Sequence, residues 1–205
     1  MPHRLVEVED YPAGETTRSV QAAYERAYGH DSKQPGVYAP RDWSRLSFAL
    51  DQTIKGGTVL DIGSNRGQFP NMLAETERYR RIVSVDVTLN RNFLPLHMDA
   101  IEYLKMSVAD LEFDDRSFDV VTCFEVLEHL EPEILLAGLS ELRRVCKRQL
   151  LISVPYAEAP PIFRGHRRRF VDADLAELFP HADLTLLKGR NSQWMFIEED
   201  LETLA

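Results

Sequence analysis

The segment VLDIGSNRGQF, residues 59–69, combines residue types that can hold a ligand through the main chain. An apolar run ends at Asp61, and Gly63 and Gly67 follow, four positions apart. Glycine lets the chain turn sharply and lets a ligand approach without side-chain hindrance. The segment contains neither the G-x-G-x-x-G of dinucleotide-binding loops nor the Gly-Lys-Ser/Thr ending of phosphate-binding loops. This pattern therefore indicates a different kind of ligand.

Two further carboxylates follow later apolar runs. Asp86 comes 19 positions after Gly67, and Asp110 ends a third run. Asp86 is placed to accept hydrogen bonds from two ribose hydroxyls, and Asp110 could accept a hydrogen bond from the exocyclic amine of a purine. The bulky Asn65 and Arg66 argue against a pyrophosphate, whereas the free N–H groups of a helix start suit a carboxylate.

Together these residues favour a ligand with a ribose, an adenine and a small charged amino-acid tail. Any single aspartate at the end of a strand could instead cap a helix or form a turn. Their order after successive strands favours the binding site.

Two histidines are candidates for acid–base chemistry. His129 lies in FEVLEHLEP and His166 in IFRGHRRRF. Histidine is the usual base near neutral pH, so either could take a proton from an acceptor hydroxyl. Glu125, Glu128 and His129 form the spacing E-x-x-E-H, which could hold a divalent cation with His166 as a fourth ligand. We do not favour this metal site, because His129 and Glu128 could equally make structural contacts at a helix start.

A cluster of arginines is the one local excess of positive charge. Arg164, Arg167, Arg168 and Arg169 lie within six positions of one another. Bordering an acceptor pocket, they would favour a phosphate or carboxylate on the acceptor. A solvated loop explains them equally well.

The elements that must position these residues follow from hydrophobic patterning. Short apolar runs alternate with helical patterns, which predicts a parallel sheet covered on both faces. The runs RIVSVDV, KMSVAD, FDVVTCF and QLLISVP follow the glycine segment. Two final runs, DLTLLKG and QWMFIEE, are separated only by RNS, so these two must form an antiparallel hairpin. The predicted helices cover residues 19–28, 41–55, 68–78, 95–104, 133–146 and 172–179, and residues 1 to about 17 are predicted to form a loose arm. The fold class is α/β, a three-layer doubly wound, mostly parallel seven-stranded sheet with a C-terminal β-hairpin.

Composition narrows the class of protein. The chain has 205 residues and a net charge of −9, which argues against general affinity for nucleic acid. We expect no membrane span and no secretory signal. Cys123 and Cys146 lie in apolar segments without metal-ligand spacing, which favours a reducing compartment, and we expect a cytoplasmic location. The sequence predicts no particular oligomeric state.

The motifs VLDIGSNRG, VSVDV, VADLEFDDRSFDVVTCFEVLEHL and LLISVP, with the closing hairpin, resemble the class I S-adenosylmethionine-dependent methyltransferases. The resemblance covers residues 57–198 and is nearest to the small-molecule branch that includes ubiquinone-biosynthesis O-methyltransferases. One departure is Asn65, at the middle position of the family's usual G-x-G-x-G. The resemblance implies a domain division into an N-terminal arm with lid helices, residues 1–56, and a cofactor-binding core, residues 57–205.

The resemblance also implies roles for individual residues. The loop residues would surround the methionine part of the cofactor, Asp86 would hold the ribose, and Val87 would pack on the adenine. Asp110, with the main chain of its two neighbours, would face the adenine amine, and the main chain at Phe124 would receive the methionine amino group. Helix 19–28 and the segment with Tyr38 would form the lid. The full set implied for the cofactor is Asp61, Gly63, Ser64, Asn65, Gly67, Asp86, Val87, Ala109, Asp110, Leu111 and Phe124.

The function implied is transfer of a methyl group from S-adenosylmethionine to a hydroxyl or amine of a small or carrier-bound acceptor. The alternatives are a metal-assisted RNA 2′-O-methyltransferase and a catalytically silent domain that binds the cofactor or a partner. The absence of G-x-G-x-x-G and the terminal hairpin disfavour a nicotinamide-dependent oxidoreductase.

Overall fold

The structure is a computed structural model, and it describes residues 5–9, 11–29, 40–91, 93–189 and 192–202. Tyr38, expected in the lid, lies outside the described residues.

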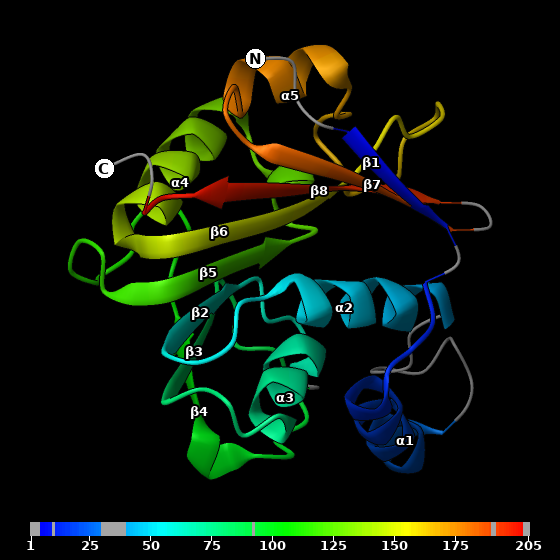
Figure 1. Cartoon of the computed structure of the whole chain (residues 1–205), viewed down its shortest axis with the longest axis vertical. Helices are drawn as coiled ribbons and strands as arrows, with labels where there is room; N and C mark the ends of the chain where they lie inside the picture. Colours follow the sequence, from blue (N-terminus) through cyan, green and yellow to red (C-terminus); the bar gives the residue numbers. More distant parts are fainter. Residues whose placement is uncertain (1–4, 10, 30–39, 92, 190–191, 203–205) are drawn as a thin grey trace.

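The described residues form one eight-stranded sheet in the order β1-β7-β8-β6-β5-β2-β3-β4 (Figure 1). All neighbours are parallel except those of β8, which runs antiparallel to both β6 and β7. The strands are β1 (Leu5–Glu9), β2 (Thr58–Ile62), β3 (Arg81–Asp86), β4 (Ile101–Lys105), β5 (Phe118–Phe124), β6 (Cys146–Pro155), β7 (Asp183–Lys188) and β8 (Gln193–Asp200).

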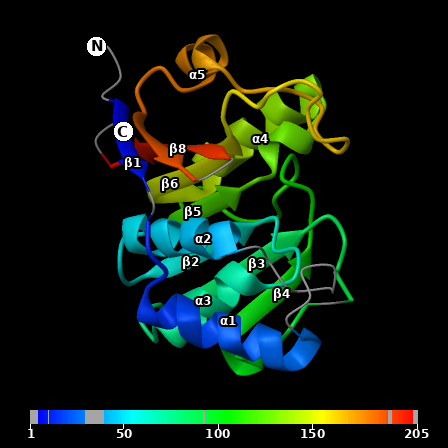
Figure 2. The same ribbon diagram turned by 90° about the vertical axis from the view of Figure 1, so that its right-hand side faces the viewer.

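Helices cover both faces of the sheet. Because successive strand residues point to opposite faces, Leu60 and Ile62 of β2 join one buried cluster while Val59 joins the other. The first cluster includes α4 (Pro132–Val145) and α5 (Asp172–Leu178). The second includes α1 (Glu15–Tyr28), α2 (Pro40–Gln52) and α3 (Gln68–Glu75), which lie together in Figure 2. Two short 3₁₀ turns, η1 (Met98–Ala100) and η2 (Leu127–His129), complete the described elements.

The doubly wound sheet and its C-terminal hairpin are confirmed, with one strand more than the predicted seven. The additional strand is β1, in the segment predicted to be a loose arm, and it pairs in parallel with β7 at the edge of the sheet. Its sequence LVEVE alternates apolar and acidic residues and stays largely exposed. Such a short, exposed edge strand buries too little to leave a strong sequence signal.

The prediction for residues 95–110 is wrong in detail. The predicted helix 95–104 is the turn η1 followed by β4, and the predicted strand 105–110 is a turn with an isolated bridge between Ser107 and Asp110. β4 pairs with β3 alone, so the burial of IEYLK is irregular and resembles helical spacing.

Within the part of the chain that the structure describes, none of the helices has the length and apolar character that crossing a bilayer requires. Cys123 and Cys146 are both buried and unpaired.

Candidate active site

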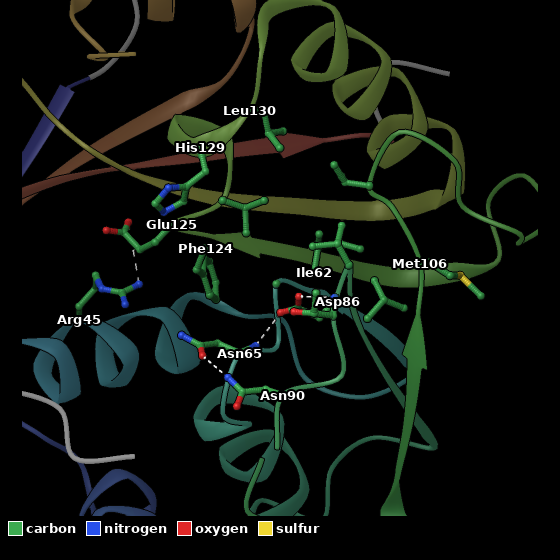
Figure 3. A pocket seen from close by; sticks show the side chains of 16 residues that line it. Arg45, Ile62, Asn65, Asp86, Asn90, Met106, Phe124, Glu125, His129 and Leu130 are labelled. Atoms are coloured by element: carbon green, nitrogen blue, oxygen red, sulfur yellow. Dashed lines mark hydrogen bonds and ion pairs between the residues drawn. The ribbon is translucent and has the colours of Figure 1, made fainter. Parts of the chain in front are cut away.

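A cavity of about 410 Å³ opens beyond the carboxyl ends of β2, β3 and β5 (Figure 3). This is where open α/β sheets bind ligands. The loop after β2, the end of β3, the segment after β4 and the turn after β5 all contribute side chains. Of the residues expected to hold a cofactor, the cavity brings together Gly63, Asn65, Asp86, Val87 and Phe124. We call it the cofactor cavity.

The loop after β2 has the bare main chain that its glycines predicted. Gly63 has φ 82° and Gly67 has φ 83°, both in the left-handed region. A Cβ on Gly63 would lie 2.3 Å from Val126 Cγ2, so a larger residue would force Val126 or the loop to shift. Asn65 also has positive φ, 46°. Asparagine tolerates this region better than other non-glycine residues, which explains how it can occupy a position that is usually glycine.

Asp86 ends β3 with its carboxylate beside this loop. Oδ2 accepts a hydrogen bond from the main-chain N–H of Asn65 at 2.9 Å, and Oδ1 accepts one from that of Thr88 at 3.1 Å. These bonds fix the carboxylate at the wall of the cavity, as Figure 3 shows. A carboxylate oxygen can accept more than one bond, so ribose hydroxyls could still donate to it.

Asp61 and Ser64 lie behind the loop rather than in the main cavity. The Asp61 carboxylate accepts hydrogen bonds from Ser84 Oγ and Thr122 Oγ1, each at 3.0 Å, and Ser84 also contacts Ser64 Oγ at 2.6 Å. Burial raises the pKa of Asp61 to about 7, although these hydrogen bonds oppose the shift. Both residues line a small recess that joins the loop to Arg45, so they support the loop from its inner side.

The residues expected around the adenine are only partly brought together. Val87 lines the cofactor cavity together with Met106 and Val108. Asp110 is exposed and lies in an adjoining hollow with Val87 and Met106.

The two neighbours of Asp110 line neither space. The main-chain N–H of Ala109 donates to Ser107 Oγ at 3.3 Å, and Leu111 is buried, with its N–H donating to Glu141 Oε2 at 3.0 Å. The main chain at Leu111 is therefore occupied within the protein.

Arg45 of α2 is a cavity residue that sequence reasoning missed. Arg45 is only 7% exposed, and its Nη1 lies 3.5 Å from Ser153 Oγ and 4.0 Å from Glu125 Oε1. Its Nε has no hydrogen-bond partner among the described residues, although Arg45 lines both the cavity and the recess. A buried cation with unused donors is suited to an anionic group of a ligand. The signal was a charged residue on the otherwise apolar face of helix 41–55.

A second cavity of about 470 Å³ lies at the ends of β6 and β7 and the start of β8. Its walls include the aromatic residues Tyr156, Phe163 and Trp194. Glu125 lines both cavities, His129 the first and His166 the second, and the two imidazole rings lie 4.9 Å apart. The two spaces therefore meet at the histidine pair. We call the second space the β6–β8 cavity.

Both histidines are oriented by bonds at Nδ1. His129 Nδ1 lies 2.9 Å from the main-chain oxygen of Gly165, and His166 Nδ1 lies 2.7 Å from Glu158 Oε2. Since a carbonyl and a carboxylate only accept, both Nδ1 atoms carry a proton, and Nε2 is the atom that bears the lone pair in the neutral form of each ring. The Nε2 atoms lie 3.9 Å and 4.0 Å from Glu128 Oε1.

Glu128 is the most perturbed carboxyl of the site. It is 1% exposed, and neither oxygen has a hydrogen-bond partner among the described residues. Burial and the nearby negative charge of Glu125 raise the pKa of Glu128 from 4.5 to about 9. At neutral pH the carboxyl is therefore protonated, and it places no full negative charge beside the imidazoles.

These three residues are suited to a divalent cation. Their ligand atoms lie within 4.8 Å of one another, and an orphaned carboxyl with two oriented imidazoles is a chemically suitable donor set. Glu125, the fourth candidate, does not join them. Its Oε1 accepts from Ser153 Oγ at 2.9 Å and its Oε2 from Trp194 Nε1 at 3.1 Å.

The arginine cluster lies on the same loop as His166, but none of its four residues lines either cavity. Arg167 pairs with Glu131 at 3.3 Å, Arg168 lies 3.9 Å from Asp174, and Arg169 donates to the main-chain oxygen of Ala157. An anionic group of an acceptor would reach these side chains only from outside the cavity.

Comparison with known proteins gives a consistent result. Residues 60–152 match the family model described as "Methyltransferase domain". The chain is 30% identical over 95 residues to a mitochondrial ubiquinone biosynthesis O-methyltransferase of Candida albicans, which covers 42% of this chain and 29% of that protein. It is 29% identical over 109 residues to a ubiquinone biosynthesis O-methyltransferase of Vibrio atlanticus (strain LGP32), and this alignment covers 48% of this chain and 44% of that protein. The chain thus spans less than half the length of these curated relatives.

Among solved structures, the fold is similar to that of 1,6-didemethyltoxoflavin-N1-methyltransferase of Burkholderia thailandensis, which was solved with 1,6-didemethyltoxoflavin and S-adenosylhomocysteine bound. The TM-score is 0.58 at 18% identity, over 91% of this chain and 78% of that one. The domain match over residues 60–152, the curated relatives and the fold agree in what the chain is similar to, the class I S-adenosylmethionine-dependent methyltransferases.

Proposed function

We propose that this chain transfers the methyl group of S-adenosylmethionine to a hydroxyl or amine of a small or carrier-bound acceptor. The observation that carries the proposal is the junction of two cavities at His129 and His166. The methyltransferases named among the similar proteins include two O-methyltransferases and one N-methyltransferase, which supports either acceptor atom.

The donor would occupy the cofactor cavity in an extended arrangement. Asp86 would accept from the ribose hydroxyls, and the apolar side chains of Val87, Met106 and Val108 would enclose the adenine. The guanidinium of Arg45 would pair with the carboxylate of the methionine part beside the glycine loop, and the main chain at Phe124 would receive its amino group. Asp110 would border the adenine from the adjoining hollow.

When bound, S-adenosylmethionine supplies an activated methyl group, so the protein mainly aligns the acceptor for in-line transfer. For a hydroxyl acceptor, His166 is our proposed general base. Its Nδ1–H is held by Glu158 and its Nε2 lone pair can take the acceptor proton. His129 would act at the same junction, from the cofactor side. Protonated Glu128 would place no full negative charge beside the two imidazoles.

The test combines cofactor binding with turnover. Wild-type protein should bind S-adenosylhomocysteine in a calorimetric titration and methylate members of an acceptor panel when supplied with labelled donor. His166→Ala should lower kcat at least 100-fold for a hydroxyl acceptor and change cofactor affinity less than threefold. Glu133→Gln, an exposed change on α4, is the control. Absence of cofactor binding at millimolar concentration would overturn the proposal, and full turnover by both His166→Ala and His129→Ala would refute the base.

A second possibility for the chemistry rests on the cluster of Glu128, His129 and His166. A divalent cation held by these three residues would act as a Lewis acid that lowers the pKa of an acceptor hydroxyl. Mn²⁺ should then raise the thermal unfolding temperature of wild-type protein but not that of Glu128→Gln. Chelation should abolish turnover and Mn²⁺ or Mg²⁺ should restore it. Turnover that survives chelation would leave His166 as the base.

A further inference from the structure

The departure at Asn65 has a structural counterpart in a second asparagine. Asn65 lies in the loop after β2, and Asn90 lies in the segment after β3. Asn90 Nδ2 donates a hydrogen bond to Asn65 Oδ1 at 2.8 Å, and both residues line the cofactor cavity (Figure 3). The bond links two separate walls of the cavity. We call it the amide bridge.

The main chain on both sides of the amide bridge is fixed. On one side, the N–H of Asn65 donates to Asp86, the proposed ribose ligand. On the other, the N–H of Asn90 donates to Tyr103 Oη at 3.0 Å. The Tyr103 ring stacks on Phe93 with centroids 4.2 Å apart.

Phe93 also fits against Gly67, where a Cβ would lie 2.7 Å from its ring. The segment after β3 therefore packs directly on the loop after β2. The main chain N–H of Leu94 adds a bond to the oxygen of Arg66 at 3.2 Å.

The direction of the bridge determines what Asn65 can offer a ligand. Since its Oδ1 accepts from Asn90, its amide N–H groups are what it can present to an acceptor atom. Asn65 lines both the cofactor cavity and the recess next to Arg45. In Figure 3 its amide nitrogen points away from Asn90. A glycine at this position would provide neither the amide bridge nor a side-chain N–H group that could donate a hydrogen bond.

We propose that Asn65 and Asn90 are a positioning pair for the methyl donor. The amide bridge holds the two loops at the spacing that the ribose requires. The side-chain amide of Asn65 donates a hydrogen bond to an oxygen atom of S-adenosylmethionine. This inference rests on the proposed function, because it assumes that the donor occupies the cofactor cavity. It adds Asn90 to the residues expected at the cofactor and gives Asn65 a specific role, and the effect of both should fall on binding of the methyl donor and not on the acceptor.

The experiment is a double-mutant cycle with Asn65→Gly, Asn90→Ala and the double variant. Glycine adopts φ 46° without strain, so Asn65→Gly removes the side chain and keeps the loop conformation. The dissociation constant for S-adenosylhomocysteine is measured by calorimetry. KM for donor, KM for acceptor and kcat are measured with labelled methyl donor and an acceptor from the panel above.

Each single variant should raise the dissociation constant and the donor KM by about 3- to 10-fold, the range for one neutral hydrogen bond. The dissociation constant of the double variant should exceed that of the weaker-binding single variant by less than twofold, because both substitutions remove the same hydrogen bond. The acceptor KM and the kcat at saturating donor should stay within twofold of wild type. A merely structural role would instead lower the unfolding temperature and kcat together.

The inference is overturned if Asn65→Gly binds donor as tightly as wild type, or if the two single effects multiply in the double variant. Failure of the proposed function looks different, because wild-type protein itself would then not bind S-adenosylhomocysteine. Gln52→Ala is the control. It removes an exposed amide side chain from the end of α2, and Gln52 lines neither cavity, so donor affinity should stay within twofold.

Discussion

Glu128→Gln should stabilise the protein, increasingly so as the pH rises. Glu128 is buried without a hydrogen-bond partner among the described residues, and burial raises the pKa of its carboxyl from 4.5 to about 9. Glutamine has nearly the same shape and is uncharged at every pH. The substitution therefore removes the ionisation of residue 128 and leaves its packing.

The magnitude and its sign follow from proton linkage. Below pH 4.5 both the folded and the unfolded states hold the proton, so Glu128 brings no pH dependence. Between pH 4.5 and about 9 only the folded state holds it, and the free energy of unfolding falls by about 1.36 kcal/mol per pH unit. The accumulated loss is about 3 kcal/mol at pH 7 and about 6 kcal/mol at pH 9. Glu128→Gln avoids this loss.

The assay is urea unfolding of both proteins at pH 5, 7 and 9 after treatment with chelator. The gain in unfolding free energy for Glu128→Gln should be under about 1 kcal/mol at pH 5 and should increase at each higher pH. Turnover should persist if His166 is the base, because glutamine is neutral like protonated Glu128, and it should fall if a cation at Glu128, His129 and His166 carries the chemistry, because glutamine supplies no carboxylate ligand. Glu133→Gln, exposed on α4, should show no pH-dependent difference.

A difference between wild type and Glu128→Gln that is constant from pH 5 to pH 9 would refute the raised pKa. Equal or lower stability of the variant at pH 9 would refute the claim that the buried carboxyl costs stability. If the variant is more stable and keeps full turnover, the carboxyl is buried as argued but has no part in the chemistry.

Three further predictions concern the cofactor cavity. Asp86→Ala should weaken binding of S-adenosylhomocysteine by about 1–3 kcal/mol in calorimetry, the cost of a lost charge-assisted hydrogen bond, and unchanged affinity would place the ribose elsewhere. Gly63→Ala should lower the unfolding temperature and abolish cofactor binding, because its Cβ would lie 2.3 Å from Val126 Cγ2 at φ 82°. Gly29→Ala has nearly the same φ, 83°, in open space, so it reports the backbone strain alone and should leave cofactor binding unchanged. Arg45→Met should raise the dissociation constant at least tenfold, and it should have a smaller effect on a nucleoside that lacks the methionine carboxylate; an equal effect on both ligands would contradict the proposed pairing.

The central strands were predictable because their burial leaves a simple signal. β2, β3, β5 and β6 are short apolar runs, and each was expected within a few residues of its observed bounds. The loops after them followed from topology, since the carboxyl ends of parallel strands meet at one edge. β1 and β4 lie at the two edges of the sheet, where partial exposure weakens the pattern.

The site residues were predictable only where a single motif holds them. Arg45 lines the cavity from α2, outside the glycine-loop motif. In the helical pattern it appears only as a charged residue among apolar ones, so the pattern gave it no role. The spacing E-x-x-E-H suggested that Glu125 and Glu128 share one helical face. The structure separates them, because Glu125 has φ 55° and the 3₁₀ turn η2 begins only after it. Its carboxylate therefore turns to Trp194 and Ser153, while Glu128 faces the histidines.

Left-handed backbone occurs at five non-glycine residues among those described; three of them lie at this site, and two, Glu77 and Arg116, lie elsewhere. Such residues cost folding free energy, so they persist only where the surrounding structure holds them. Of the three at the site, Asn65 and Glu125 line the cofactor cavity, and Ala157 lines the β6–β8 cavity with Glu125. Each follows closely on the carboxyl end of a different central strand, β2, β5 or β6. The strain thus lies where the chain must turn out of the sheet and present a side chain or a bare main chain to a ligand. A sequence records only residue types, so these three positions could not be distinguished from ordinary turns until the strands were placed.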